Sequence, residues 1–172
     1  MVKWLVNKKI DRNYLEIFSL SELNEIKNPS SEFILELIDP PNFQLNKFFY
    51  KEIGKNHRWI DRLIWNDKEW IKYTTNSNIK TYVLKKKDDL VGYFELIFHD
   101  DKNETEIAYL GILEEYLNKK LGSYLLSSAI IKSFLNKPKR VWVHTCSLDH
   151  KNALNNYISR GMKIFKKETI TI

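Results

Sequence analysis

The stretch Arg140–Met162, RVWVHTCSLDHKNALNNYISRGM, places a strand pattern directly before a helical one. Residues 140–145 form a short apolar and β-branched run that is typical of a buried strand. Residues 151–160 are interpreted as a helix, and Gly161 ends it because glycine readily takes the left-handed conformation found after helices. A further extended pattern at 163–172 follows. The order strand, helix, strand in this part of the chain indicates an α/β fold.

Upstream of this stretch, the hydrophobic pattern has a period of two. Residues 79–87, 90–99 and 105–113 are predicted to be three strands joined by short polar turns, which makes an antiparallel meander. Residues 117–134 form a helix with a wide apolar face, and Pro138 ends it. A strand, a helix and then a strand in one sheet form a right-handed parallel crossover. The sequence therefore predicts a mixed α/β sheet, mostly antiparallel, flanked by helices.

The N-terminal third carries weaker strand signals and two helical ones. Residues 14–19 and 33–38 are predicted to be short strands. Apolar residues at helical spacing over 43–54, with a glycine at the end, predict a helix. A second helix is expected from Asn66, because this N-cap residue has a carboxylate three positions later.

Composition and charge narrow the class of protein. The 172 residues are 43% hydrophobic and 29% charged, so we expect one globular domain over residues 1–172, with 1–12 as an extension of uncertain role. The lone Cys146 and the charged N-terminus favour a cytoplasmic location, and the longest uncharged run in the second half, 121–131, is too short to span a membrane. The net charge of +6 is scattered, which argues against nucleic-acid binding but leaves a local phosphate-bearing ligand open.

The start of the predicted helix at 117–134 is a candidate anion site. Free amide groups at a helix start, the helix dipole and the neighbouring Lys119 and Lys120 favour a pyrophosphate. The patterns GxxxxGK[ST] and GxGxxG do not occur, which argues against a nucleoside triphosphate loop and a dinucleotide fingerprint.

A cluster of metal-ligand residue types follows strand 140–145. His144 and Cys146 share one face of the strand, and Asp149 and His150 follow in the turn. Two ligands on one strand and a turn rarely complete the tetrahedron that zinc requires, so we expect no metal.

The spacing Ala153-x-x-x-Tyr157-x-x-x-Gly161-Met162 resembles the signature of the GNAT family of N-acetyltransferases, with methionine for the usual phenylalanine. HTCSLDHKNALNNYISRG is similar to a bacterial subgroup of the family, and so is the Gly-x-x-x-x-Trp-x-Asp-Arg pattern over 54–62. In the family's phosphate loop only Gly122 matches. The departures from that pattern are at Glu114, Leu117 and Lys120. The resemblance spans roughly residues 14–167.

The resemblance implies a GNAT-type sheet splayed between its fourth and fifth strands, here 105–113 and 140–145. Pantetheine would add to the sheet as a strand in that gap, and acetyl-CoA would serve as the co-substrate. Cysteine 146 would not be a nucleophile, because transfer in the family is direct. The residues that would hold acetyl-CoA are Leu110, Ile112, Leu117, Asn118, Lys119, Lys120, Leu121, Gly122, Ser123, His150 and Ala153.

The resemblance also implies an acid and a base. Tyr157 would protonate the leaving thiolate, unless it is only a core tyrosine. Glu106 would deprotonate the amine, unless it is a solvated strand-end residue, and Glu95 is the alternative base. The acceptor would lie against residues before the second helix, of which Trp59 is equally well explained as core. With Glu95, these substrate-binding candidates are His57, Trp59, Asp61 and Arg62.

These residues favour an N-acetyltransferase acting on a primary amine of a small molecule or peptide. The alternative from another class is a non-catalytic acyl-CoA-binding sensor, which the departures at Leu117 and Lys120 motivate. We expect acetyl-CoA and an amine as partners, no nucleic acid, no membrane, and a monomer or homodimer.

Overall fold

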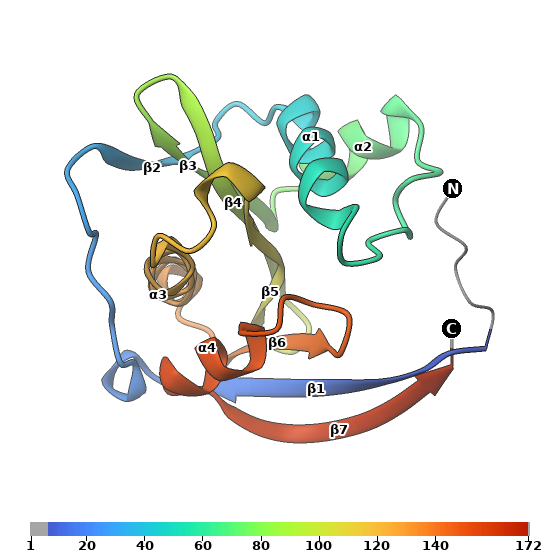
Figure 1. Ribbon diagram of the computed structural model, residues 1–172, viewed down its shortest axis with the longest axis vertical. Helices are drawn as coiled ribbons and strands as arrows, with labels where there is room; N and C mark the ends of the chain where they lie inside the picture. Colours follow the sequence, from blue (N-terminus) through green and yellow to red (C-terminus); the bar gives the residue numbers. More distant parts are fainter. Residues whose placement is uncertain (1–6, 172) are drawn as a thin grey trace.

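One seven-stranded sheet organises the computed structural model, which describes residues 7–171 (Figure 1). The strand order is β2-β3-β4-β5-β6-β1-β7. Among the described strands only β5 and β6 pair in parallel, which confirms the predicted mostly antiparallel sheet and its crossover. The strands are β1 (Lys9–Ile17), β2 (Phe33–Leu37), β3 (Ile79–Lys86), β4 (Asp89–His99), β5 (Glu104–Ile112), β6 (Arg140–Cys146) and β7 (Lys163–Thr171).

Four α-helices cover the two faces of this sheet (Figure 1) in the described part of the chain. The helices α1 (Phe43–Gly54) and α2 (Asp67–Thr74) lie on one face, and α3 (Leu121–Ser133) and α4 (Ala153–Ser159) lie on the other. Three short 3-10 turns complete the secondary structure, at Leu20–Glu22, Glu114–Tyr116 and Phe134–Asn136.

Each face of the sheet has its own core. On the α3 side, Leu125, Leu126 and Ile130 are fully buried against strand residues such as Phe94 and Val141. This matches the wide apolar face predicted for the helix, since nearly every turn of α3 contributes to the core.

The core on the α1 side is smaller and aromatic. Phe49 stacks on Tyr93 with ring centroids 4.7 Å apart, and Ile53 and Val83 pack beside them. Offset aromatic pairs of this kind stabilise a core beyond the area they bury. The two cores hold the helices on opposite faces of β4 and β5, the strands that lead to the cleft described below.

Several predicted boundaries are confirmed by the structure. Helix α1 covers 43–54 as predicted, and Asn66 and Glu69 form a reciprocal capping box at the start of α2. Other boundaries differ. Strand β1 begins at Lys9, five residues earlier than predicted. Its first residues are mostly polar, so they show no hydrophobic alternation, but they pair with β7 on one side and β6 on the other. The proposed extension 1–12 therefore enters the sheet, and residues 1–6 and 172 lie outside the described part of the chain.

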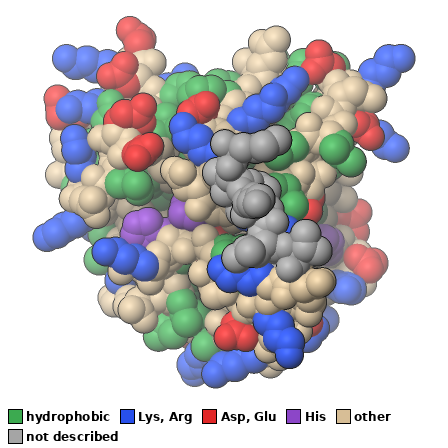
Figure 2. Space-filling model, turned by 45° about the vertical axis from the view of Figure 1, so that its right-hand side comes forward, with side chains coloured by type: hydrophobic (Ala, Val, Ile, Leu, Met, Phe, Trp, Pro, Cys, Tyr) green, Lys and Arg blue, Asp and Glu red, His purple; other side chains and the backbone are tan. Residues whose placement is uncertain are grey.

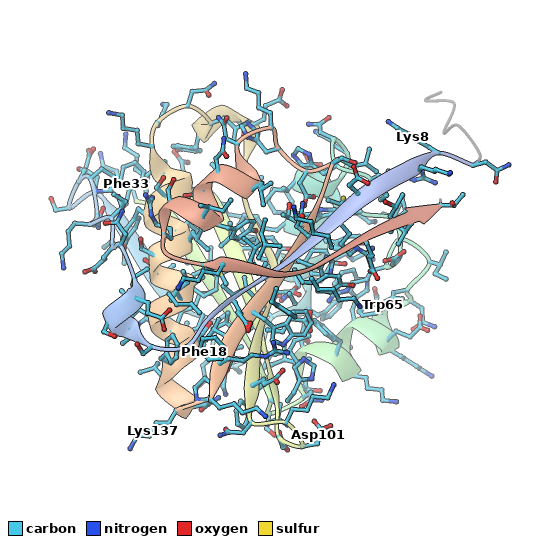
Figure 3. All side chains as sticks on the ribbon, turned by 90° about the horizontal axis from the view of Figure 1, so that it is seen from below. Lys8, Phe18, Phe33, Trp65, Asp101 and Lys137 are labelled. Carbon is cyan, nitrogen blue, oxygen red and sulfur yellow. The ribbon has the colours of Figure 1, made fainter. Side chains whose placement is uncertain are left out.

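The strands β1 and β7 form one edge of the sheet. Seen from below, they run side by side, with Lys8 and Phe18 near the two ends of β1 (Figure 3). Tyr14 of β1 donates a hydrogen bond from its hydroxyl to Glu168 of β7 at 2.7 Å. This edge of the sheet forms one side of the cleft, through Ile10 and Arg12 of β1 and Ile170 of β7.

Gly161, which was predicted to end the helix in the opening stretch, has φ +104°. A Cβ at this position would lie 2.1 Å from the backbone oxygen of Glu22, so a side chain meets both a strained backbone conformation and a clash. Gly161→Ala should lower the free energy of unfolding by about 2–4 kcal/mol in urea titrations. Gly122→Ala is the control: its Cβ would meet only the side chain of Asn156, at 4.0 Å, and the helix should gain a few tenths to about 1 kcal/mol. Equal losses in the two variants would contradict this assignment.

Candidate active site

The two central strands separate part-way along their length. β5 and β6 pair only over Glu104–Glu106 and Arg140–Trp142. Beyond these residues β5 continues to Ile112 and β6 to Cys146 without pairing to each other. A cavity of about 610 Å³ opens in the gap, and its lining includes residues 107–112, 143–144 and Cys146. This confirms the predicted splay.

The edge of β5 that faces this gap carries backbone groups free to bind. The N–H of Leu113 donates to Val91 of β4 at 2.8 Å. Backbone groups alternate in direction along a strand, so residues 109, 111 and 113 turn theirs to β4, whereas Leu110 and Ile112 turn theirs into the gap. An extended ligand could therefore pair with this edge as an added strand.

The start of α3 closes one end of the cavity. Asn118 and Lys120 both have φ +61°, and the helix begins at Leu121 instead of the predicted 117. Two left-handed residues so close together interrupt the helical hydrogen-bond pattern. No described side chain caps α3, which leaves its first amide groups without a side-chain partner, and Leu121, Gly122 and Ser123 of this first turn line the cavity.

Most of the predicted cofactor loop lines the cavity. Leu117, Asn118 and Lys120 line it, whereas Lys119 lies outside the lining, with its Nζ 5.4 Å from the ring centroid of Tyr116. The Lys120 backbone adopts the left-handed conformation that glycine favours, so the loop keeps a glycine-like path although a lysine occupies the position.

Tyr157 enters the cavity from α4, on the face of the sheet covered by α3. It is only 9% exposed and belongs to the α3-side core, and its hydroxyl has no hydrogen-bond partner among residues 7–171. Burial raises the pKa of Tyr157, and the negative charge of Asp149 adds to the effect, so the phenol stays protonated at neutral pH.

The turn between β6 and α4 is held by its own side chains. Asp149 accepts hydrogen bonds from the Thr145 hydroxyl at 2.5 Å and from the Cys146 amide at 3.0 Å. His150 accepts one from the Asn152 amide at 3.2 Å, just before α4, which begins at residue 153 and not at the predicted 151. His150 and Ala153 both line the cavity, and their contact with a cofactor stays a prediction.

The structure separates Glu95 from the cavity. Its side chain is fully buried and accepts hydrogen bonds from Asn46 at 2.7 Å, Tyr73 at 2.8 Å and Arg62 at 2.9 Å. Glu95 was the alternative base and Arg62 a predicted acceptor contact, but both lie outside the cavity lining, where each satisfies the other's charge.

Aromatic rings enclose the Arg62 guanidinium. Its carbon lies 4.1 Å from the ring centroid of Tyr73, 4.4 Å from Tyr109 and 4.8 Å from Trp65, which stands beside α2 (Figure 3). Burial alone would lower the pKa of Arg62, but the charge of Glu95 outweighs it and raises the pKa. The cluster anchors the segment between α1 and α2 to the sheet.

That anchored segment forms the wall opposite β6. His57, Trp59 and Asp61 line the cavity, and their contact with an acceptor stays a prediction. His57 Nδ1 lies 3.2 Å from the backbone oxygen of Leu148, so the wall touches the turn after β6. Trp59 is also core, since its ring centroid lies 4.8 Å from that of Tyr109, and the two explanations of this residue coexist.

Glu106, the predicted base, lies at the point where β5 and β6 part. Its carboxylate is 3.0 Å from His99 Nε2, and its side chain is 16% exposed. It does not belong to the cavity lining. Any action of Glu106 on an acceptor must therefore pass through a neighbouring group.

Sequence reasoning missed residues that β1, β6 and β7 bring to the cavity. Ile10, Arg12, His144 and Ile170 line it. Their positions depend on strand pairing across the chain, β1 with β6 and β1 with β7, which local patterns do not reveal. For His144 a signal existed: it alternates with the buried Val143, so the histidine had to face away from the α3-side core.

Within residues 7–171, no group of three or more His, Cys, Asp or Glu side chains is arranged to hold a metal ion. No described helix is long and apolar enough to cross a membrane. Lysine and arginine side chains are spread over the face in Figure 2 among acidic ones, and histidine side chains reach the surface of the same face.

Comparison with known proteins identifies the fold. Residues 35–162 match the acetyltransferase (GNAT) family. A functionally unknown conserved protein from Staphylococcus epidermidis is 15% identical with a TM-score of 0.63, over 95% of this chain and 61% of that one. A GCN5-related N-acetyltransferase from Kribbella flavida is 12% identical with a TM-score of 0.68, over 94% and 57%.

A third similar structure is an aminoglycoside acetyltransferase, meta-AAC0020, from an uncultured soil metagenomic sample. It is 14% identical with a TM-score of 0.63, over 77% of this chain and 90% of that one. The chain spans only about three fifths of the first two structures. No curated protein sequence matches it. The family match covers most of the chain and the splayed sheet agrees with it, so this chain belongs to the acetyltransferase (GNAT) family.

Proposed function

We propose that this chain is an N-acetyltransferase that transfers the acetyl group of acetyl-CoA directly to a primary amine. The observation that carries the proposal is the continuous cavity between the separated strands β5 and β6. It runs from the free amides at the start of α3, past Tyr157, to the wall at His57 and Asp61. A cavity of this extent would hold a long phosphorylated thioester together with an acceptor.

The chain's own groups fit each part of acetyl-CoA. The first amides of α3 and the Lys120 side chain would hold the pyrophosphate. Leu110 and Ile112 would pair with pantetheine and donate hydrogen bonds toward the thioester carbonyl, where negative charge develops during attack. His150 and Ala153 would contact the pantetheine from the opposite side of the gap.

Proton transfer completes the proposed reaction. Tyr157 would donate a hydrogen bond to the sulfur, and its proton would pass to the sulfur as the carbon–sulfur bond breaks. A protonated amine cannot attack, so a base is required on the acceptor side. Glu106 was the predicted base, but its carboxylate contacts His99 and does not line the cavity, so we propose that Glu106 supports this proton transfer without touching the acceptor.

The sensor hypothesis remains the second candidate, and one observation favours it. Lys120 places a Cβ where the family's loop has glycine, and Leu117 replaces its polar residue, so the loop is less open to a phosphate. A sensor would bind acetyl-CoA without releasing thiol when amines are added. An enzyme would release CoA thiol in proportion to the amine acetylated.

Calorimetric titration with acetyl-CoA tests the cofactor site. Lys120→Glu should weaken binding about tenfold, which corresponds to about 1.4 kcal/mol, because it reverses a charge next to the pyrophosphate. The effect should shrink in raised salt. Lys119→Glu is the matched control: the same charge change is made one residue away, outside the lining, and should weaken binding much less.

Two outcomes would contradict the proposal. Absence of binding by the unmodified protein at millimolar acetyl-CoA would remove the acetyltransferase hypothesis. Equal losses in Lys119→Glu and Lys120→Glu would mean that only general surface charge attracts the ligand, and not the start of α3.

The acceptor and the setting remain to be assigned. One similar structure is titled as an aminoglycoside acetyltransferase, so an aminoglycoside belongs in an amine panel with tyramine, spermidine and a lysine-containing peptide. We propose that the protein works in the cytoplasm as a monomer or homodimer, without a metal, nucleic acid or membrane as partner.

A further inference from the structure

The cavity presents different chemistry from the two faces of the sheet. Along β6, Val141 and Val143 point into the α3-side core, which Tyr157 also joins. The alternation of a strand turns His144 and Cys146 to the opposite face, which the wall before α2 borders. A thioester in the gap would have the tyrosine on one side and the histidine on the other.

His144 differs from the other three histidines of the chain. His57 contacts the Leu148 carbonyl, His99 contacts Glu106, and His150 accepts from the Asn152 amide. Both ring nitrogens of His144 are without a hydrogen-bond partner among residues 7–171, and the side chain is exposed to the cavity that it lines. It therefore has a nitrogen lone pair to offer to a ligand.

The groups around His144 favour its neutral form. Partial burial lowers the pKa of His144, and Arg12 of β1 lowers it further. Negative charges on Glu106, Asp149 and Glu168 act in the opposite direction without reversing the shift. The Tyr14 ring of β1 also lies beside His144, with its centroid 5.6 Å from that of the imidazole. A neutral imidazole at pH 7 is a base that is ready to accept a proton.

We propose that His144 is the catalytic base that takes the proton from the acceptor's ammonium group, and that Glu106 influences this base only through its negative charge. This inference rests on the proposed function. It gives the acceptor a direct proton acceptor inside the cavity, a role that Glu106 cannot fill from outside the lining.

The protons balance in this scheme. The ammonium loses one proton to His144, and the free amine attacks the thioester carbon. As the carbon–sulfur bond breaks, sulfur takes the Tyr157 proton, and the second proton leaving nitrogen returns to Tyr157 through water. The products are an amide, CoA thiol and one proton that His144 releases to solvent.

The test is the pH dependence of kcat/KM for the most active amine of the panel, measured between pH 5 and 10. With His144 as base, kcat/KM of the unmodified enzyme should be constant from neutral pH up to the pKa of the amine. It should decrease at pH values below the lowered pKa of His144. In His144→Gln, kcat/KM should be about a hundredfold lower at pH 7. It should then rise about tenfold per pH unit, because only the free amine can react. If His144 had only a structural role, its replacement would lower kcat/KM by the same factor at every pH and leave the slope of the pH profile unchanged.

Glu106→Gln distinguishes the two candidates. Removing its negative charge should move the acid limb of the profile to lower pH and keep the plateau, since Glu106 raises the His144 pKa. If Glu106→Gln loses the plateau and His144→Gln keeps it, Glu106 is the base and the inference is overturned. Unchanged acetyl-CoA affinity in both variants shows that they fold. Turnover by the unmodified enzyme supports the proposed function whatever the variants do, and absence of turnover with every amine overturns both.

Discussion

Replacing Glu95 by alanine should lower the free energy of unfolding by about 3–5 kcal/mol, the largest change in stability that we expect from a single side chain of this protein. Glu95 has no exposed surface, and its carboxylate balances the charge of Arg62 inside a shell of aromatic rings. Without it the guanidinium stays buried and unpaired, and Asn46 and Tyr73 lose an acceptor. Urea titration measures the loss, which corresponds to a fall in Tm of about 10 °C.

Two further variants make this result specific. Glu36→Ala removes a carboxylate that lies 2.6 Å from Lys85, but both side chains are partly exposed, so the loss should stay under about 1 kcal/mol. The double variant Arg62→Met with Glu95→Leu should be more stable than Glu95→Ala, because it leaves no unpaired charge. A loss as small as that of Glu36→Ala would show that water reaches the pair.

Tyr157→Phe should lower kcat about 10²- to 10³-fold while acetyl-CoA affinity changes little. The substitution removes only a hydroxyl whose oxygen has no partner within residues 7–171, so it creates no unsatisfied group and little cavity. What is lost is the proton for the departing sulfur, a contribution made in the transition state. Thiol release under saturating acetyl-CoA measures kcat, and calorimetry measures affinity.

Tyr124→Phe is the control for this variant. Tyr124 lies on α3 and packs against the same core, but it does not line the cavity. It should keep kcat within about twofold. If Tyr157→Phe retains full turnover, the tyrosine is a core residue only, and the leaving thiolate takes its proton from water.

The parts of the fold that sequence reasoning predicted are those with strong local signals. Gly54, the last residue of α1, and the capping box at Asn66 mark real helix ends, and the period-two pattern locates β3, β4 and β5. The start of α3 was predicted four residues too early because Asn118 and Lys120 take a left-handed conformation, which is uncommon for residues other than glycine and which the lysine in particular gives no reason to expect. Local patterns thus predict elements well, and loop geometry poorly.

The motifs in the sequence pointed to residues that the structure brings to the cavity, whereas residues that strand pairing brings there were missed. Tyr157, His150 and the segment around Trp59 line the cavity, and their roles toward cofactor and acceptor stay predictions. Arg62 belongs to the same motif, yet the structure turns it inward to Glu95, because a buried carboxylate on β4 needs a partner. Arg12 lies on β1, far away in sequence from the other cavity residues. No local pattern could predict that it lines the cavity together with the segment between α1 and α2.

The splay of the sheet has a consequence for amide hydrogen exchange. The half made of β2–β5 and the half made of β6, β1 and β7 are joined by only three residue pairs, so the amides of Leu110 and Ile112 stand in the middle of the molecule without a strand partner. They should exchange with solvent far faster than the amides of Tyr109 and Gly111 beside them. A ligand that pairs with this edge would slow exchange at alternate residues, a pattern set by the sheet itself and independent of any movement of the chain.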